Sequence, residues 1–124
     1  MSAVIDTDVF VDFFRSYGPS KQWFNRLDWS ETYFSAITEA ELLSASDCNV
    51  EERLVKTLQF LSFANKIPVD NDVARKAGEF RRKYGVPLQD SMIAATAFIL
   101  KVPLMTKNRK HFDKIKEIKV AVPY

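Results

Sequence analysis

The sequence predicts an α/β fold: an open, mostly parallel sheet with helices on both faces. Short strand-like apolar runs recur along the chain, and segments with helical apolar spacing separate them. Strands that alternate with helices are typical of a parallel sheet, whose crossover helices cover it on two sides. The 124 residues are enough for one hydrophobic core, so we expect a single domain over residues 1–124.

The first expected element is a short buried strand over residues 2–6, which ends at Asp6. A helix is expected from Asp8 onward, because apolar side chains then recur at helical spacing. They are Val9, Phe10, Phe13, Phe14 and Tyr17. Gly18 and Pro19 end this helix, and Pro19 suits the first turn of a second short one.

The same alternation continues through the middle of the chain. Residues 32–37 are rich in β-formers and predict a strand, and residues 38–45 predict a helix. An amphipathic helix is expected over residues 50–64. Its apolar face would carry Val50, Leu54, Leu58 and Leu61. A further short strand is expected at residues 66–69.

The second half begins with a helix over residues 70–85. Asp70 or Asn71 suits its N-cap and Gly85 its end. Its apolar stripe would be Val73, Ala77, Phe80 and Tyr84. Residues 88–101 are apolar on nearly all sides after Asp90, which indicates a helix buried within the fold. The last two strands are expected over residues 102–106 and 118–124.

Composition excludes several classes of protein. Hydrophobic residues make up 47% of the chain, so it is globular rather than disordered. No apolar run approaches the length of a membrane span, and the N-terminus does not resemble a secretory signal. The single cysteine, Cys48, cannot form an internal disulfide, which indicates a reducing cytoplasm. The net charge of +2 is too small to indicate a nucleic-acid partner by itself.

Acidic residues fall where the strands of the predicted sheet end, which is where open α/β sheets bind ligands. Asp6 ends the first strand, Glu41 lies in the helix after the second, and Asp90 opens the buried helix. A buried carboxylate needs a partner, and Mg²⁺ or Mn²⁺ would supply one through oxygen ligands. The sequence has no cluster of His and Cys residues of the kind that binds zinc. Such an all-oxygen site suits phosphodiester hydrolysis, and Asp8, two residues beyond Asp6, can join it.

Each acid also has a structural explanation. Asp8 would cap a helix that starts at Val9, and Asp90 would favour its helix N-terminus. Thr38 and Glu41 have the spacing of a capping box. Asp6 is the exception, because no helix that it would cap well follows it directly.

The segment after the fourth predicted strand is polar and basic. Thr106, Lys107, Arg109 and Lys110 are weak candidates for RNA contacts, and a solvated loop is the alternative. His111 is a lone histidine, to which we assign neither a ligand nor a base role.

Four ordered segments, VIDTDVFVD, SAITEAELL, LQDSMIAATA and PLMTKNRKHFDKI, resemble the PIN-domain ribonucleases, and most closely the VapC toxins of VapBC toxin–antitoxin pairs. The resemblance covers essentially the whole chain. It implies a three-layer α/β/α sandwich on a parallel five-stranded sheet, Mg²⁺- or Mn²⁺-dependent endonuclease activity on RNA, a homodimer, and inhibition by a small VapB-like antitoxin.

Three residues match the family's characteristic acids at its catalytic metal site: Asp6, Glu41 and Asp90. Asp8 stands where relatives often have Asn, Ser or Asp. Asn108 stands where many PIN domains carry Asp, and His111 where others have an acid. Asp8 and Asn108 are therefore further candidate metal ligands. Either Asp8 or an RNA phosphate would supply the negative charge that is lost where Asn108 replaces an acid.

Two alternative functions and two structural expectations remain open. A nuclease-inactive PIN-like module that binds RNA or protein is the first alternative, and a phosphotransfer domain with Asp47 as acceptor is the second. Trp23 and Phe24, in the second helix, are expected to form a partly exposed groove for a helix of the antitoxin. Asp12 is expected to be exposed.

Overall fold

The computed structural model describes residues 1–124 and contains one sheet of five strands, all parallel. The strand order is β3-β2-β1-β4-β5. The strands are β1 (Ala3–Ile5), β2 (Thr32–Ser35), β3 (Asn65–Ile67), β4 (Leu104–Met105) and β5 (Val120–Ala121). The expected parallel α/β architecture is confirmed.

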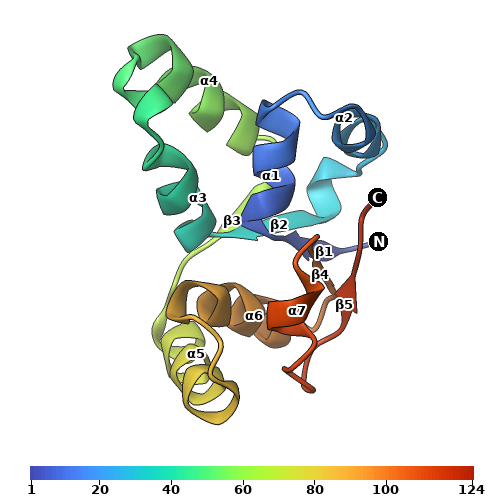
Figure 1. The fold of residues 1–124 in the computed structure, drawn as a ribbon, viewed down its shortest axis with the longest axis vertical. Coiled ribbons are helices and arrows are strands. Elements are labelled where there is room, and N and C mark those ends of the chain that lie inside the picture. The colour runs from blue at the N-terminus through green and yellow to red at the C-terminus, as the bar shows by residue number, and fades with distance from the viewer.

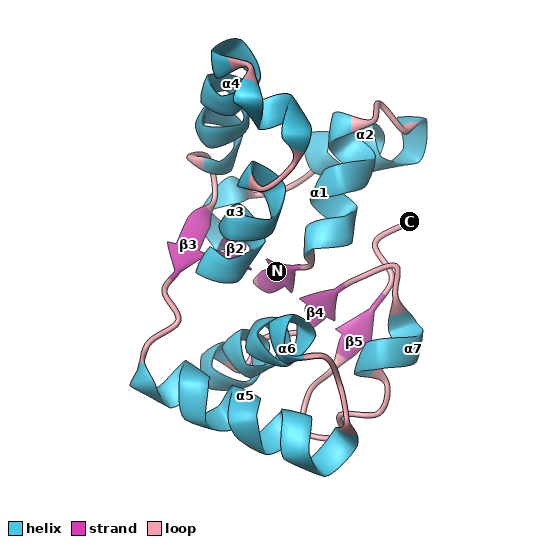
Figure 2. Cartoon of the chain, turned by 60° about the vertical axis from the view of Figure 1, so that its left-hand side comes forward, coloured by secondary structure: helices cyan, strands magenta, loops and turns pink.

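Seven α-helices connect the strands. They are α1 (Thr7–Phe14), α2 (Gly18–Asn25), α3 (Ala36–Leu43), α4 (Glu51–Leu61), α5 (Asn71–Tyr84), α6 (Leu88–Leu100) and α7 (Arg109–Phe112). Helices α1 to α4 lie on one side of the sheet and α5 and α6 on the other, which gives three layers (Figure 1). Figure 2 shows the same separation from another side. None of the helices is long and apolar enough to span a lipid bilayer.

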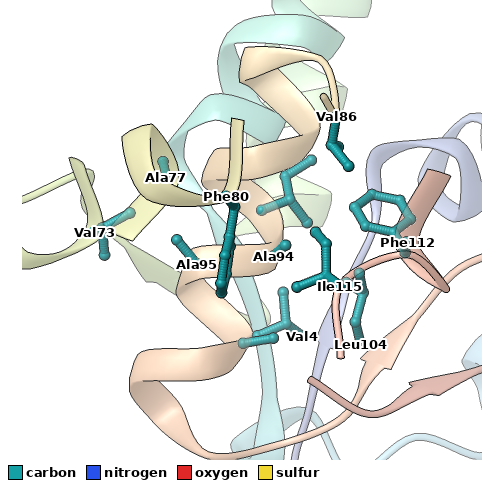
Figure 3. Packing of buried hydrophobic residues seen from close by; sticks show 12 residues of the cluster. Val4, Val73, Ala77, Phe80, Val86, Ala94, Ala95, Leu104, Phe112 and Ile115 are labelled. Atoms are coloured by element: carbon teal, nitrogen blue, oxygen red, sulfur yellow. The ribbon is translucent and has the colours of Figure 1, made fainter. Parts of the chain in front are cut away.

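Two hydrophobic clusters fill the spaces between the layers. Successive residues of a strand point to opposite faces, so Val4 packs toward α5 and α6 while Ile5 packs toward α1 and α2. Figure 3 shows the first cluster, in which Phe80 of α5 lies against Ala94 and Ala95 of α6. The prediction that α6 is buried is confirmed.

Helix α5 matches its prediction closely. The Asp70 carboxylate caps it by accepting a hydrogen bond from the Val73 N–H at 2.9 Å. Gly85 ends it in the left-handed region, at φ 69°, which glycine adopts without a steric penalty. Three residues of the expected stripe are buried: Val73, Ala77 and Phe80.

Other helices differ from their predictions. Helix α1 ends at Phe14, three residues before Tyr17. Helix α3 begins at Ala36, inside the segment expected as a strand, because the Ser35 side chain accepts a hydrogen bond from the Ile37 N–H at 3.1 Å. The predicted capping box of Thr38 is therefore wrong, since Ser35 is the N-cap.

The apolar face predicted for α4 is only partly correct. Leu61 is buried, but Val50 is 57% exposed and Leu58 39% exposed. Phe60 packs against the core instead, with its ring 4.3 Å from that of Phe13. Helix α4 therefore leaves apolar side chains in contact with solvent.

Candidate active site

The acidic residues gather where the parallel strands end. The loops after β1 and β4 are joined there, because the Asp6 N–H donates to the Met105 carbonyl oxygen at 2.9 Å. Parallel strands all end at the same edge of the sheet, so the helices that follow them start there too. This edge brings Asp6, Thr106 and the N-terminus of α1 together.

Asp6 is almost fully buried, at 5% exposure, and both of its oxygens are hydrogen-bonded. Oδ1 accepts from the Thr7 N–H at 2.8 Å, and Oδ2 accepts from the Thr106 hydroxyl at 2.7 Å. Asp6 is thus the N-cap of α1, and the expectation that it caps no helix is wrong. The prediction of Asp8 as the N-cap fails for the same reason. Loss of solvation, followed by the negative charge of Asp8, raises the pKa of Asp6 to about 8.

Asp8 lies in the first turn of α1 and its carboxyl faces that of Asp6. Its Oδ1 is buried without a hydrogen-bond partner. Burial raises the pKa of Asp8, although the nearby carboxyl of Asp6 and the backbone N–H of Lys107 act in the opposite direction. An unpartnered buried oxygen is unfavourable, so this atom is suited to a cation.

Glu41, on α3, is connected to this pair through Thr7. The Thr7 hydroxyl donates to Glu41 Oε1 at 2.7 Å and also lies 3.0 Å from the Thr38 hydroxyl. Because the Thr7 N–H is bonded to Asp6, one residue connects the two acids.

Asp90 and Asn108 meet at His111. His111 Nδ1 lies 2.8 Å from Asp90 Oδ2 and 3.0 Å from Asn108 Nδ2. The Asn108 N–H also donates to the Thr106 hydroxyl at 2.9 Å. No role was predicted for His111 from the sequence. Its position three residues after Asn108, which places both on one face of a helical turn, was the available signal.

The predicted acids do not all surround one point. No three His, Cys, Asp or Glu side chains are grouped closely enough to hold a metal ion together. Asp6 and Asp8 form a pair, whereas Glu41 bonds to Thr7 and Asp90 to His111. The pair nevertheless fits a hard divalent cation, because its donors are all oxygens, one is unpartnered, and no cation offsets their charge.

The candidate RNA contacts differ in environment. Thr106 is fully buried and bonds Asp6, unlike a residue that contacts RNA from the surface. Lys107, Arg109 and Lys110 are exposed. The Arg109 guanidinium pairs with Asp113 at 3.3 Å, and Lys110 makes no ion pair.

In metal-free protein, Asp6→Asn is expected to raise the melting temperature. A carboxyl whose pKa is higher in the folded than in the unfolded state destabilises the fold progressively as pH rises from the unfolded pKa to the folded pKa. For Asp6 this window runs from about pH 4 to about pH 8. The gain should therefore be roughly 3–8 °C at pH 8 and much smaller at pH 5. Calorimetry in EDTA measures it, with Asp72→Asn, on the exposed start of α5, as control. A lower melting temperature at pH 8 would assign Asp6 a purely structural role.

Three comparisons relate the chain to known proteins. The family model for the PIN domain matches residues 3–118. Ribonuclease VapC1 of Rickettsia felis is 26% identical over 136 residues, which cover 97% of this chain and 95% of the relative. Ribonuclease VapC10 of Mycobacterium tuberculosis is 30% identical over 129 residues, covering 97% and 94%. Among solved structures, a toxin–antitoxin complex from Klebsiella pneumoniae aligns with a TM-score of 0.85 and 29% identity, covering 99% of this chain and 98% of that one.

Proposed function

Because the chain belongs to the PIN domain family, we propose that it is an endoribonuclease of the VapC type, which hydrolyses RNA phosphodiester bonds with Mg²⁺ or Mn²⁺. The observation that carries the proposal is the buried pair of Asp6 and Asp8, with its unpartnered Oδ1 at the sheet edge. The relatives are named ribonucleases, and the oxygen donors of the pair suit a hard divalent cation that can also bind phosphate.

Asp6 and Asp8 would hold the metal, with Glu41, Asp90 and Asn108 beside them. A divalent ion held there would supply an activated water and stabilisation of negative charge on the phosphate and the leaving oxygen. The remaining groups of the site hold these ligands in place. Hydrogen bonds to both oxygens of Asp6 restrict its rotation, so its position is set before substrate arrives.

Two contacts orient Glu41 and Asp90 at the edge of the sheet where the strands end. Thr7 holds Glu41 through its hydroxyl, and His111 holds Asp90 through Nδ1. Because the carboxylates are already oriented, less free energy is needed to arrange them when substrate binds.

The experiment that tests this function incubates the purified protein with structured RNA. Cleavage should require Mg²⁺ or Mn²⁺ and stop in EDTA. Binding of RNA without cleavage, with either metal or with none, would instead favour the nuclease-inactive module. That alternative is considered because Asn108 stands where many PIN domains have a fourth acid.

We further propose a VapB-like antitoxin as partner of a homodimeric toxin in the cytoplasm. The solved structures of similar fold include toxin–antitoxin complexes. The expected groove of Trp23 and Phe24 is only partly correct: Trp23 is half-buried, whereas Phe24 is 2% exposed and belongs to the core. Phe14 and Phe63 are exposed instead, at 37% and 64%.

Two hollows adjoin these exposed rings. One, of about 300 Å³, is lined by Phe13, Phe24, Asn25, Trp29, Phe60 and Phe63. The other, of about 320 Å³, lies between α1, α3 and α4 and includes Phe14, Arg53 and Glu41 in its lining. A partner helix with apolar side chains would cover the rings, and a cationic side chain could then reach Glu41.

Phe63→Ala is expected to weaken the complex with the antitoxin about 10- to 30-fold, because a large exposed ring is a typical interface anchor. RNA cleavage by the isolated chain should remain, since Phe63 precedes β3 whereas Asp6 follows β1, which places them at opposite ends of the parallel strands. Calorimetric titration with the partner measures the effect, and Ile99→Ala, an exposed residue of α6, is the matched control. Equal affinity of both variants would remove this surface from the interface.

A further inference from the structure

Three aromatic rings from separate segments meet beside α2. The Tyr124 ring centroid lies 5.8 Å from that of Tyr17 and 6.2 Å from that of Trp23. Tyr17 belongs to the turn between α1 and α2, and Tyr124 follows β5. Figures 1 and 2 both show the C-terminal segment running from β5 toward α2. Tyr17 is 48% exposed, so this aromatic cluster presents a ring to solvent.

Tyr124 is held firmly in this cluster. Its hydroxyl donates to Asp12 Oδ2 at 2.6 Å, and its carbonyl oxygen accepts from Lys107 Nζ at 2.9 Å. The same ammonium lies 4.5 Å from the Tyr124 ring centroid, within range of a cation–π interaction. Asp12, expected to be exposed, is therefore half-buried and bonded.

Asp12 also sets the position of Tyr17. The Asp12 carbonyl oxygen accepts from the Tyr17 N–H at 3.1 Å, which closes the end of α1. This closure places Ser16 at φ 61°, in the left-handed region that disfavours residues other than glycine. The two tyrosines are thus oriented by one aspartate, through its side chain and its backbone.

The cluster lies close to the acidic edge. Asp12 follows Asp8 by one turn of α1, and the backbone N–H of Lys107 faces the Asp8 carboxyl. The Lys107 side chain is exposed, and one N–H of its ammonium bonds the Tyr124 oxygen, so the remaining N–H groups can contact an anion. A series of contacts therefore connects Asp8 to Lys107, Lys107 to Tyr124, and Tyr124 to the exposed ring of Tyr17.

We propose that Tyr17 and Lys107 form a subsite for an unpaired nucleotide next to the scissile phosphate, with Tyr124 as a positioning residue. The base stacks on Tyr17, and Lys107 contacts the phosphate. This inference rests on the proposed nuclease function and assigns residues of this chain to one nucleotide of the substrate. Every base has a flat face that can stack on an aromatic ring, but bases inside a duplex are already stacked.

The test measures RNA binding in EDTA, so that it does not depend on cleavage. Fluorescence anisotropy compares an unpaired oligoribonucleotide with a duplex of equal length. The wild-type protein should bind the unpaired strand more tightly. Tyr17→Ala should weaken that binding about tenfold, whereas Tyr17→Phe, which keeps the ring, should bind within about twofold of wild type.

The role of Lys107 has its own matched pair. Lys107→Gln should weaken binding and make the slope of log affinity against log salt shallower by about 0.7, as loss of one phosphate contact does on single strands. Lys119→Gln removes the same charge at the opposite end of the sheet and should leave this slope unchanged. Tyr124→Phe should weaken binding less than Lys107→Gln does, because the ring and carbonyl oxygen that contact Lys107 remain and only the hydrogen bond that anchors the ring to Asp12 is lost.

Three contrary outcomes distinguish failure of the subsite proposal from failure of the nuclease proposal. If Tyr17→Ala binds and cleaves RNA like wild type, the subsite is wrong and the nuclease proposal stands. If Tyr17→Ala weakens only the complex with the antitoxin, this surface contacts protein and the inference is overturned. If the wild-type protein neither binds nor cleaves any RNA, the proposed function itself fails and the subsite with it.

Discussion

Asp6→Asn is expected to lower the rate of metal-dependent RNA cleavage by at least about 100-fold. Asparagine has nearly the same shape, and its Oδ1 can still accept the N–H of Thr7, so α1 keeps its cap. The substitution removes one of the two carboxylates that face each other at the sheet edge. Cleavage of a labelled RNA at saturating Mg²⁺ or Mn²⁺ measures the rate.

Two comparisons make this result interpretable. Asp90→Asn should cause a comparable loss if Asp90 belongs to the same site, whereas Asp72→Asn, at the exposed start of α5, should cleave like wild type. Circular dichroism should be unchanged in all three variants. Full activity of Asp6→Asn would remove Asp6 from the catalytic site.

Expression of the chain without a partner is expected to stop growth of the host cell, because an uninhibited endoribonuclease destroys RNA that the cell needs. Co-expression of a small neighbouring gene for the antitoxin should restore growth. Colony counts under an inducible promoter, with and without the second gene, measure both effects. This is the largest effect expected in cells, since the toxin acts catalytically.

Asp6→Asn is the matched control for this experiment as well. It should accumulate to a similar level and leave growth unaffected, because its fold is retained while cleavage is lost. Growth arrest by Asp6→Asn would mean that toxicity comes from binding or aggregation rather than from hydrolysis. If the wild-type chain does not affect growth and no small protein co-purifies with it, a nuclease that acts without an antitoxin becomes the better interpretation.

Much of the fold was predictable from the sequence, because the signals that define it are local. The cap at Asp70 and the end at Gly85 lie within one helical turn of the groups they satisfy, so both were correct for α5. The alternation of apolar strands and helices likewise predicts a parallel sheet. The short helix α7 was missed, since four residues carry too little periodicity to recognise.

Local ambiguity explains the errors at the helix starts. Asp6, Asp8, Ser35 and Thr38 all carry side chains that can cap a helix, and the sequence offers several compatible starts. The ends of β1 and β2 show which of these starts the chain uses. Because the strands end at Ile5 and Ser35, the next turn had to begin there, and Asp6 and Ser35 became the caps.

The sequence by itself determined the α/β architecture, the family motifs and the identity of the acids at the strand ends. Only the tertiary structure decided what surrounds each acid. Thr106 bonds Asp6 from 100 residues away, and Tyr124 bonds Asp12 across 112 residues. Such contacts depend on how distant segments pack, and no periodicity within a segment encodes them. Burial is equally a property of the folded chain, so the raised pKa of Asp6 arises from packing that the sequence does not display.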